Sequence, residues 1–545
     1  MSHRVLAFVV ALATMCAGCT KISTSTGPQT QRSAADSEVL RVSDISDPST
    51  LNPMLSGADV AYNLASYSLE YLVQLDGNGE LTPVLCTRVP SVENGDVSRD
   101  GLTITYHLRK GVSWQDGVPF TSADIVATWK QVMNPLNPVI VRTGYEVIDR
   151  IETPDKWTAV LRLKQPYAPL PTRFLAGIQE GPIPVLPAHL ISNQKDLVHS
   201  SFNTSPVGTG PFIVQSWEHN GRLVFVANPH YWRGAPKLRK IIFQAQPSQA
   251  TEIVGFQSHE IDADFDTGPA DLPSYELISG MQIKRSPSLR LSVVQMYAGP
   301  GHPLRDKRLR QALAYAIDRQ EALHKINHDV GTMADEFLPA WSWAYTPDVP
   351  HYDYDPKKAQ TLLDQAGWRP GPDGIRVKDG QRLTLLIIGS TGSDSTRRFN
   401  TLLQSHLRAI GIEGLIKEFP YGLVFDYNGP IRQGHFDLAS FTYSVNFDPS
   451  ALQDDGCDQF SPAGANAGRL CDPDVDRLER RALAIYDRAK RRPLYAEIER
   501  RRMDDLVTLP LYYRDRVGVT TTALQGYVPS RGIMPNWNAW QWSLP

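Results

Sequence analysis

Residues 100–124 read DGLTITYHLRKGVSWQDGVPFTSAD and place a strand signal a short distance before a helix signal. In residues 102–108 apolar and polar side chains alternate, and this period of two is typical of a strand with one buried face. Thr121 and Asp124 have the spacing of a capping box, which closes the first turn of a helix through reciprocal hydrogen bonds. Because an apolar run follows from Ile125 to Met133, a helix is predicted to begin there.

Both signals recur along the chain, which indicates a mixed α/β fold. Further strands are predicted at 222–227, 240–245 and 383–388, the last with both faces apolar as in a covered sheet. Asp355-Pro356 combines an N-cap with a proline at the first helical position, and this helix is predicted to stop at Gly367. Asp472-Pro473 opens another helix, which should end before Pro493.

A further helix is predicted after Asp306, and its pattern is amphipathic. Leu309, Leu313 and Ile317 share one face, which should be buried. The charged side chains around them are expected to be available to solvent; they are Arg308, Arg310, Asp318 and Arg319.

Length and composition limit the classes of protein to consider. With 545 residues the chain is too long for one core, so two or three subdomains are expected. A content of 41% hydrophobic and 21% charged residues is ordinary for a soluble globular protein. The net charge of −3 gives no bulk attraction to nucleic acid, and no nucleic-acid partner is expected.

The N-terminus resembles an export signal. A short basic start at His3 and Arg4 precedes an apolar run, Val5–Met15, that is too short to span a bilayer. The small residues before Cys19 resemble a bacterial lipobox, in which the cysteine is diacylated, although Cys16 stands where leucine is usual. We therefore predict a signal peptide at 1–18, lipidation of Cys19 and a flexible tether at 19–37. A plain signal peptide cleaved nearby is the alternative.

The remaining cysteines have separate roles. Cys457 and Cys471 are close in the chain, and in an exported protein a local disulfide is predicted between them. Cys86 lies in an apolar stretch, which favours buried packing over a reactive thiol.

No catalytic or cofactor motif is present, so neither an enzyme nor a bound cofactor is predicted. His324 and His328 are four residues apart and could share a helix face, but two histidines alone make an incomplete metal site. The arginine-rich run Arg477–Arg502 could be a nucleic-acid patch. We favour solvated helices, because acidic residues such as Glu479, Glu497 and Glu499 lie at helix-neighbour spacing.

Taken together, several stretches resemble the extracellular solute-binding proteins of family 5, a group of dipeptide-, oligopeptide- and nickel-binding proteins of ATP-driven importers. The resemblance extends from Val39 to Leu544, and the order of the motifs makes it specific. The stretches are Thr50–Pro53 with Leu69–Leu72, residues 100–124, Val207–Phe212, Asn228–Trp232, Leu304–Arg319 and Asp355–Trp368.

This resemblance implies a two-lobed, periplasmic-binding-protein-like α/β fold, with mixed sheets flanked by helices, an extra inserted subdomain and a hinge between the lobes. The expected boundaries are 38–262 for lobe 1, with an insert at about 83–205, 263–511 for lobe 2, and 512–545 for the return to lobe 1. Closure around a ligand can be driven only by contacts that differ between the open and closed forms.

The resemblance also bears on ligand charge. In the dipeptide-binding relative, an aspartate three positions before an Asp-Pro pair holds the peptide ammonium; here the pair is Asp448-Pro449 and that position is Val445. The arginine that holds the carboxylate precedes an Arg-Arg helix start; here Arg397-Arg398 match that start and the earlier position is Ser390. With both charge partners absent, a zwitterionic dipeptide is disfavoured, because an unpaired buried charge is costly.

The candidate ligand-binding residues form four groups along the chain. They are Asp47, Pro48, Ser49, Ser390, Arg397, Phe419, Tyr421, Tyr443, Val445, Asn446 and Asp448. The expected partners are a peptide or small-molecule ligand, the permease subunits of an ABC transporter and the membrane, through the lipid anchor. The protein is expected to be monomeric and to face the periplasm or the cell exterior.

Three functional hypotheses follow. The first is a binding protein for peptides longer than dipeptides, held by backbone hydrogen bonds along strand edges. The second is the same scaffold with an oligosaccharide, an opine or a metal chelate, since Phe441, Tyr443 and Phe447 would suit sugar stacking. The third is a secreted enzyme or a structural surface protein, for which no site signature is present.

Replacing the predicted lipidation site tests the anchor. A Cys19→Ala variant should lose membrane association and be recovered as soluble protein, because no thiol remains to carry the diacylglycerol. Phase partitioning of parent and variant measures this. Equal partitioning of both into the membrane fraction would show that Cys19 is not the anchor.

Overall fold

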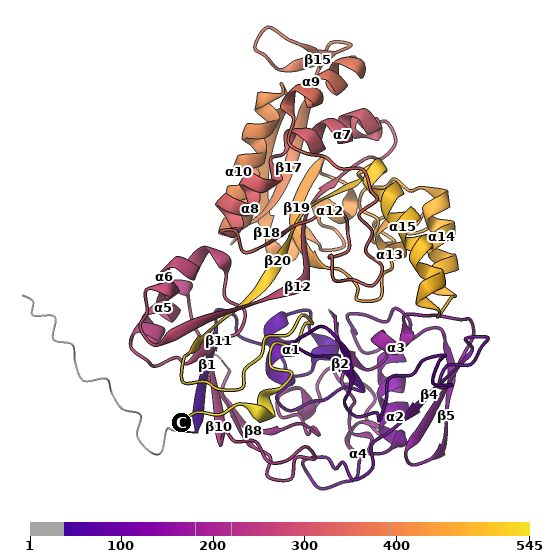
Figure 1. Cartoon of the computed structure of the whole chain (residues 1–545), viewed down its shortest axis with the longest axis vertical. Coiled ribbons are helices and arrows are strands. Elements are labelled where there is room, and N and C mark those ends of the chain that lie inside the picture. The colour runs from indigo at the N-terminus through magenta and orange to yellow at the C-terminus, as the bar shows by residue number, and fades with distance from the viewer. Residues whose placement is uncertain (1–37, 180, 220, 392) are drawn as a thin grey trace, which may run out of the picture. The chain divides into compact units, whose positions relative to one another are not determined.

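The computed structural model describes residues 38–179, 181–219, 221–391 and 393–545 (Figure 1). These residues belong to one compact unit, Glu38–Pro545. The predicted signal peptide, Cys19 and the tether lie outside the described residues. Among the described residues, no helix combines the length and apolar character needed to cross a membrane.

One mixed sheet of eleven strands runs through the unit. In order across the sheet its strands are β18 (Glu413–Pro420), β17 (Thr384–Thr391), β19 (Leu438–Ser444), β12 (Met281–Met296), β20 (Thr508–Thr521), β11 (Ala263–Asp264), β1 (Val39–Asp44), β10 (Lys240–Ala245), β9 (Arg222–Ala227) and β8 (Phe212–Trp217). The eleventh strand, β13 (Gly331–Met333), pairs with β20. The strands predicted at 222–227, 240–245 and 383–388 are confirmed as β9, β10 and most of β17.

Three small sheets complete the strands. They are β3 (Leu81–Pro83), β2 (Val73–Leu75) and β7 (Ala176–Gly177); β4 (Thr103–His107), β6 (Thr158–Leu163) and β5 (Ile148–Asp155); and β14 (Arg369–Pro370), β15 (Arg376–Lys378) and β16 (Gln381–Arg382). β4 lies inside the strand predicted from residues 102–108. Its side chains alternate between half-buried and buried, as the period of two requires.

The longer helices cover the sheets. They are α1 (Asp59–Ala65), α2 (Ser122–Met133), α5 (Gln249–Gln257), α7 (Lys307–Ala316), α8 (Arg319–Asn327), α9 (Pro356–Gln365), α10 (Asp394–Ala409), α14 (Pro473–Leu483) and α15 (Arg488–Asp505). The shorter ones are α3 (Leu170–Arg173), α4 (Ala188–Ile191), α6 (Leu272–Glu276), α11 (Tyr421–Val424), α12 (Pro430–Gln433) and α13 (Leu452–Asp455), with single 3₁₀ turns at Pro53–Leu55, Ser201–Asn203, Pro269–Asp271, Pro303–Arg305 and Ala539–Gln541.

The predicted helix starts are confirmed. Thr121 caps α2 in a capping box with Asp124, and Asp306, Asp355 and Asp472 are the N-caps of α7, α9 and α14. In each case a side-chain oxygen accepts a backbone N–H that the first turn leaves without a partner. α9 ends two residues before Gly367, which takes the left-handed conformation, with φ of +89°.

Three large hydrophobic clusters form the interior. The first core contains buried residues of 40–265 and 524–542, the second core buried residues of 54–202, and the third core buried residues of 289–513. β12 and β20 contribute Leu291 and Leu511 to the third core. Their other ends, with Ile283 and Val519, pack in a smaller cluster beside α5 and α6. This strand pair therefore connects the third core to the rest of the unit (Figure 1).

The prediction that Arg310 and Arg319 are available to solvent is wrong. Arg310 is 2% exposed and its guanidinium donates to the backbone oxygens of Leu304 and Asp505, at 2.8 and 2.6 Å. Arg319 is 7% exposed and donates to the oxygen of Ala334 at 2.7 Å. Both arginines satisfy carbonyl groups outside their own helices, up to 195 residues away at Asp505, and helical periodicity cannot show such partners.

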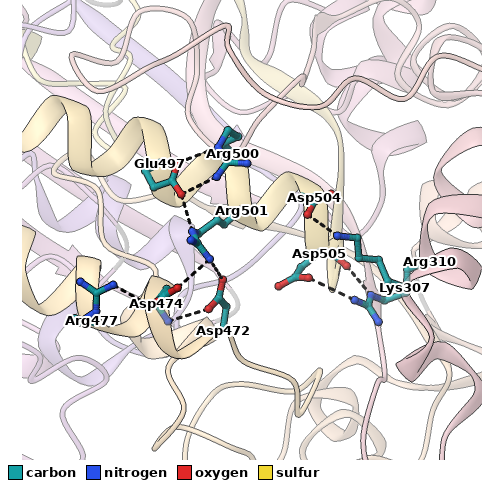
Figure 2. A network of polar contacts seen from close by, with 10 residues as sticks. All are labelled: Lys307, Arg310, Asp472, Asp474, Arg477, Glu497, Arg500, Arg501, Asp504 and Asp505. Atoms are coloured by element: carbon teal, nitrogen blue, oxygen red, sulfur yellow. Dashed lines mark hydrogen bonds and ion pairs between the residues drawn. The ribbon is translucent and has the colours of Figure 1, made fainter.

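The arginine-rich run forms α14 and α15, and many of its arginines pair with acidic residues (Figure 2). Glu497 and Glu499 pair with arginines as predicted, but Glu479 is buried and accepts from the backbone nitrogen of Ala451 instead. Arg501 contacts Glu497 at 2.7 Å one turn away and Asp472, the N-cap of α14, at 2.9 Å. Arg500 shares Glu497 at 2.6 Å. Arg491 differs from the expected solvated arginines, because it is 1% exposed and pairs with the buried Asp448.

The cysteine predictions are confirmed. Cys457 and Cys471 form a disulfide, with their Cα atoms 5.2 Å apart. Cys86 is a buried free thiol, and burial raises its pKa to about 12, which leaves it unreactive at neutral pH. Within the described residues, no group of three or more His, Cys, Asp or Glu side chains is arranged to hold a metal. His324 contacts Asp329 instead, with Nδ1 and Oδ2 2.7 Å apart.

The buried Arg491–Asp448 pair gives a stability prediction. Arg491→Met should lower the free energy of unfolding by about 3–5 kcal/mol, because it leaves the Asp448 carboxylate buried without its partner. Arg477→Met, at an exposed pair with Asp474, should change it by less than about 1 kcal/mol. Urea unfolding of both variants measures the difference. Equal, small effects would show that Asp448 remains solvated.

Candidate ligand-binding cavity

A cavity of about 420 Å³ opens where the third core meets β12 and β20. Its walls come from four strands of the main sheet and four helices beside them. The lining residues are Ser292, Val293, Ile326, Asn327, Ile388, Gly389, Ser390, Ser393, Ser395, Thr396, Phe399, Val424, Phe425, Ile431, Ala439, Ser440, Phe441, Thr442, Tyr443, Leu511, Tyr512 and Arg514. This volume lies in the range of pockets that hold small molecules or short peptide segments.

The cavity lies where two strands of the sheet stop pairing. β17 and β19 are paired at Ile387–Leu438 and Ile388–Ala439. The residues that follow on each strand, Gly389 and Ser390 on β17 and Ser440 onward on β19, line the cavity instead. Backbone groups that would have paired across this gap are available to a ligand, because every strand residue carries one donor and one acceptor.

Hydroxyl groups cover much of the wall. Ser393 is the N-cap of α10, and its Oγ accepts from the backbone nitrogen of Thr396 at 3.3 Å. Across the cavity Ser292 and Thr442 share a hydrogen bond of 2.9 Å between neighbouring strands. Ser440 donates to the buried Asn400 at 2.6 Å. These hydroxyls are neutral and can donate or accept, so they suit polar uncharged groups of a ligand.

An aromatic group forms another part of the wall. Phe441 packs edge-on against Phe425, with ring centroids 5.3 Å apart and planes at 88°. Tyr443 lies 6.2 Å from Phe441 on the same strand face, two residues along β19. Burial raises the pKa of Tyr443, so its hydroxyl stays protonated and can donate a hydrogen bond.

Two of the candidate residues predicted from the sequence, Ser390 and Tyr443, lie in this cavity. Val445 follows β19 and packs in the third core, 6% exposed. Arg397 lies in the first turn of α10 with its side chain 51% exposed, and it contacts Asp394 at 2.8 Å. Phe419 is half-buried on β18, where the ammonium of Lys417 lies over its ring.

The other candidates lie elsewhere. Asn446 accepts a hydrogen bond of 2.8 Å from Arg173 of the second core's region, and Asp448 is held by Arg491. The segment 47–49 follows β1; Pro48 is buried, and Asp47 and Ser49 are exposed. Tyr421 begins α11.

The cavity is also lined by residues that were not predicted from the sequence. Arg514 of β20 and Thr396 of α10 are two of them. Thr396 is close to Ser390 in the sequence, whereas Arg514 is brought into the same cavity only by the fold. One signal was present for Arg514. It is an arginine within the strand Thr508–Thr521, whose other residues are mostly buried.

A second, smaller cavity of about 40 Å³ lies beside Val445 and Asn446. Its lining includes Asp454, Glu479 and Glu499. Burial raises the pKa of Glu479 to about 7, and the backbone nitrogen of Ala451 partly offsets this by donating to its carboxylate. Arg502 lines the same small cavity and pairs with Glu499 at 2.9 Å, so these acidic side chains share a cation of the protein itself.

Contacts join the region of the second core to that of the third. The Tyr486 hydroxyl donates to the oxygens of Tyr167 and Gly101, at 3.1 and 3.2 Å. Phe447 packs against both cores. These contacts lie in addition to the strand pair β12–β20, so the two regions touch at more than one place.

Comparisons with known proteins agree with the arrangement of these elements. A family model described as bacterial extracellular solute-binding proteins, family 5, matches residues 80–454. Protein XP55 of Streptomyces lividans is 30% identical over 73% of this chain and 70% of its own length. The dipeptide-binding protein of Escherichia coli K12 is 25% identical, over 88% of this chain and 90% of its own.

A solved structure supports the same fold. The oligopeptide-binding protein AppA of Bacillus subtilis, in complex with a nonapeptide, superposes with a TM-score of 0.77. It is 24% identical in sequence, and the match covers 93% of this chain and 99% of AppA. The two-lobed fold expected from the sequence is therefore present. Because the family model matches more than half of the chain, the protein belongs to the bacterial extracellular solute-binding proteins of family 5.

Proposed function

We propose that the protein binds a peptide longer than a dipeptide in the 420 Å³ cavity and delivers it to the permease of an ABC importer. One observation carries the proposal: strand positions that β17 and β19 leave unpaired line the wall, and among the described residues the wall has no carboxylate that could hold a peptide ammonium. The similarity to the dipeptide-binding protein of Escherichia coli and to the oligopeptide-binding protein AppA of Bacillus subtilis supports a peptide as the ligand class.

The charged residues nearest to these positions already have partners. Asp448 pairs with Arg491, and Asp455 accepts from Arg502 at 2.6 Å. Arg397 is shared between Asp394 and Glu418. Recruiting any of them for a dipeptide terminus would break an existing pair. The ammonium of a bound dipeptide would therefore be buried without a partner, whereas a longer peptide can leave its ammonium in solvent.

Backbone recognition fits the geometry. An extended peptide beside β17 or β19 would hydrogen-bond to the groups that those strands leave unpaired after Ile388 and Ala439. Side chains of the peptide would alternate between the hydroxyl-covered wall and the aromatic group formed by Phe425, Phe441 and Tyr443. Such binding is permissive in sequence, because backbone groups are the same in every peptide.

Closure completes the proposed site. All lining residues come from 292–514, so a second wall would come from the region before residue 262. We propose lobe 1 at 38–262 with an insert at about 83–205, lobe 2 at 263–511 and a return to lobe 1 at 512–545. A ligand that touches both walls stabilises the closed form by its differential contacts, and binding proceeds without turnover.

The aromatic group supports a second candidate. Phe441 and Tyr443 could stack on a sugar ring, and the hydroxyls could bind its polar edges, so an oligosaccharide is the main alternative to a peptide, ahead of an opine or a metal chelate. In either case the protein is proposed to be exported, anchored through Cys19, monomeric and partnered with the permease. Mass spectrometry of ligand retained on the purified protein separates the candidates.

Peptide length gives a direct prediction. Free dipeptides should bind about 10–10²-fold more weakly than peptides of four or five residues, because the charge-assisted hydrogen bond of about 1.5–3 kcal/mol to the ammonium lacks a partner in the cavity wall. Calorimetric titration with an alanine series of increasing length measures this, with end-blocked dipeptides as the matched control. Submicromolar binding of free dipeptides that is lost on blocking either end would contradict the prediction.

A further inference from the structure

Arg514 has a position in the cavity that the proposed function does not yet use. It lies on β20 two residues after Tyr512, so both side chains point to the cavity face of the strand. Tyr513, between them, points to the opposite face, and its hydroxyl donates to the backbone oxygen of Glu336 at 3.1 Å. The alternation of the strand therefore directs Arg514 toward the ligand space.

A bulge in the partner strand holds this segment in place. The pairing of β12 with β20 skips from Pro287–Asp515 to Leu291–Tyr513. Ser288, within the bulge, donates from its hydroxyl to the backbone oxygen of Arg514 at 2.6 Å. Bulges re-aim side chains and occur often beside functional sites. Here the bulge fixes the backbone from which the Arg514 side chain extends.

The charges around Arg514 leave it without a partner. Arg290, on the bulge, is paired with Asp59 and with Asp266, whose Oδ1 lies 2.7 Å from its Nη1. Arg516 shares Asp266 at 3.6 Å. Among the described residues, no carboxylate lies within ion-pair distance of the Arg514 guanidinium. Arg290 and Arg516 already pair with Asp59 and Asp266. Arg514 is therefore the arginine of this group whose positive charge has no carboxylate partner.

The positive charge of Arg514 is partly removed from water. Arg514 is half-buried, and burial lowers the pKa of its guanidinium, with the charge of Arg290 adding to the effect. A desolvated cation without a counter-ion is unfavourable, so an anion placed there would be strongly favoured. The guanidinium fork is also suited to holding both oxygens of a carboxylate.

The rest of the lining has no charge of either sign. Among the described residues, Arg514 is the one charged side chain of the cavity wall, and no Asp or Glu contributes to it. A ligand ammonium would find no counter-charge there, whereas a carboxylate would find Arg514. The wall therefore discriminates by sign of charge as well as by shape.

From this geometry we infer that Arg514 is the anion-recognition residue of the cavity, and that the part of the ligand held there carries a carboxylate and no positive charge. The inference rests on the proposed function for the site, but its chemistry is more specific. In a peptide the carboxylate has two sources, the C-terminus and an acidic side chain, and the experiment separates them.

The experiment compares four pentapeptides by calorimetry. One pair has a glutamate or a glutamine at the centre, with both ends blocked; the other pair is all-alanine with a blocked N-terminus and a free or amidated C-terminus. The protein should bind one or both carboxylate forms about ten- to hundred-fold more tightly than the neutral form of the same pair. The pair that shows the preference identifies the source of the carboxylate.

Three variants assign the preference to Arg514. Arg514→Gln should abolish it while leaving the affinity for the neutral peptides within a few fold, and Arg514→Lys should retain part of it, because a lysine keeps the charge but not the fork. Arg285→Gln is the matched control, since Arg285 lies on β12, is 44% exposed and does not line the cavity. This variant should bind all four peptides as the parent does.

Stability without ligand separates binding from a structural role. Because Arg514 has no partner, Arg514→Gln should not lower the unfolding midpoint of the ligand-free protein. A marked loss of stability would overturn the inference, and so would peptide binding in which carboxylate and neutral forms are equal. If no peptide binds but a sugar acid such as galacturonate does so in an Arg514-dependent way, the peptide proposal is wrong and the anion assignment stands. If neither binds, both fail.

Discussion

The antiparallel pairing of β12 with β20 is the constraint on which the rest of the structure depends. These strands extend from the small cluster beside α5 and α6, through Ile283 and Val519, to the third core, through Leu291 and Leu511. Their backbone hydrogen bonds must be satisfied along the whole length, because unpaired buried groups are costly. The pair therefore sets where the third core lies along the sheet, and with it the position of the cavity wall.

The pairing of β12 with β20 is interrupted beside the cavity. Its register changes between Pro287 and Leu291, and the residues of the bulge take up the ion pairs and hydrogen bonds around Arg514. A second interruption, the end of pairing between β17 and β19 after Ile388, leaves backbone groups at the wall. Both interruptions weaken the ladder locally, and both are located beside the proposed ligand.

Arginines that are removed from water to different extents in this protein differ in whether the fold supplies a partner. Arg310 and Arg319 donate to carbonyl groups, and Arg491 pairs with Asp448, so each desolvated cation is satisfied within the protein. Arg514 has no such partner and lies in a cavity. An arginine whose guanidinium has a partner within the protein stabilises the structure. An arginine whose guanidinium has no such partner is available to a ligand. The contrast gives the charge of the ligand a structural basis.

Local signals were sufficient for the elements that depend on neighbours in the sequence. The capping box of Thr121, the N-caps at Asp306, Asp355 and Asp472, and the alternation in 102–108 need only a few consecutive residues, so periodicity and hydrogen-bond chemistry determine them. The disulfide between Cys457 and Cys471, which are 14 residues apart, could likewise be predicted from neighbouring residues. The order of the motifs along the chain was sufficient to indicate the family and its two lobes.

Tertiary structure decided what depends on residues far apart in the chain. The burial of Arg310 follows from carbonyl groups brought to it by the fold, and the pairing of Asp448 follows from an arginine 43 residues away. Arg514 and Ser390 meet at one cavity only because β17, β19, β12 and β20 lie in that order across the sheet. Periodicity places a side chain on a face, but only the packed fold determines what lies opposite that face.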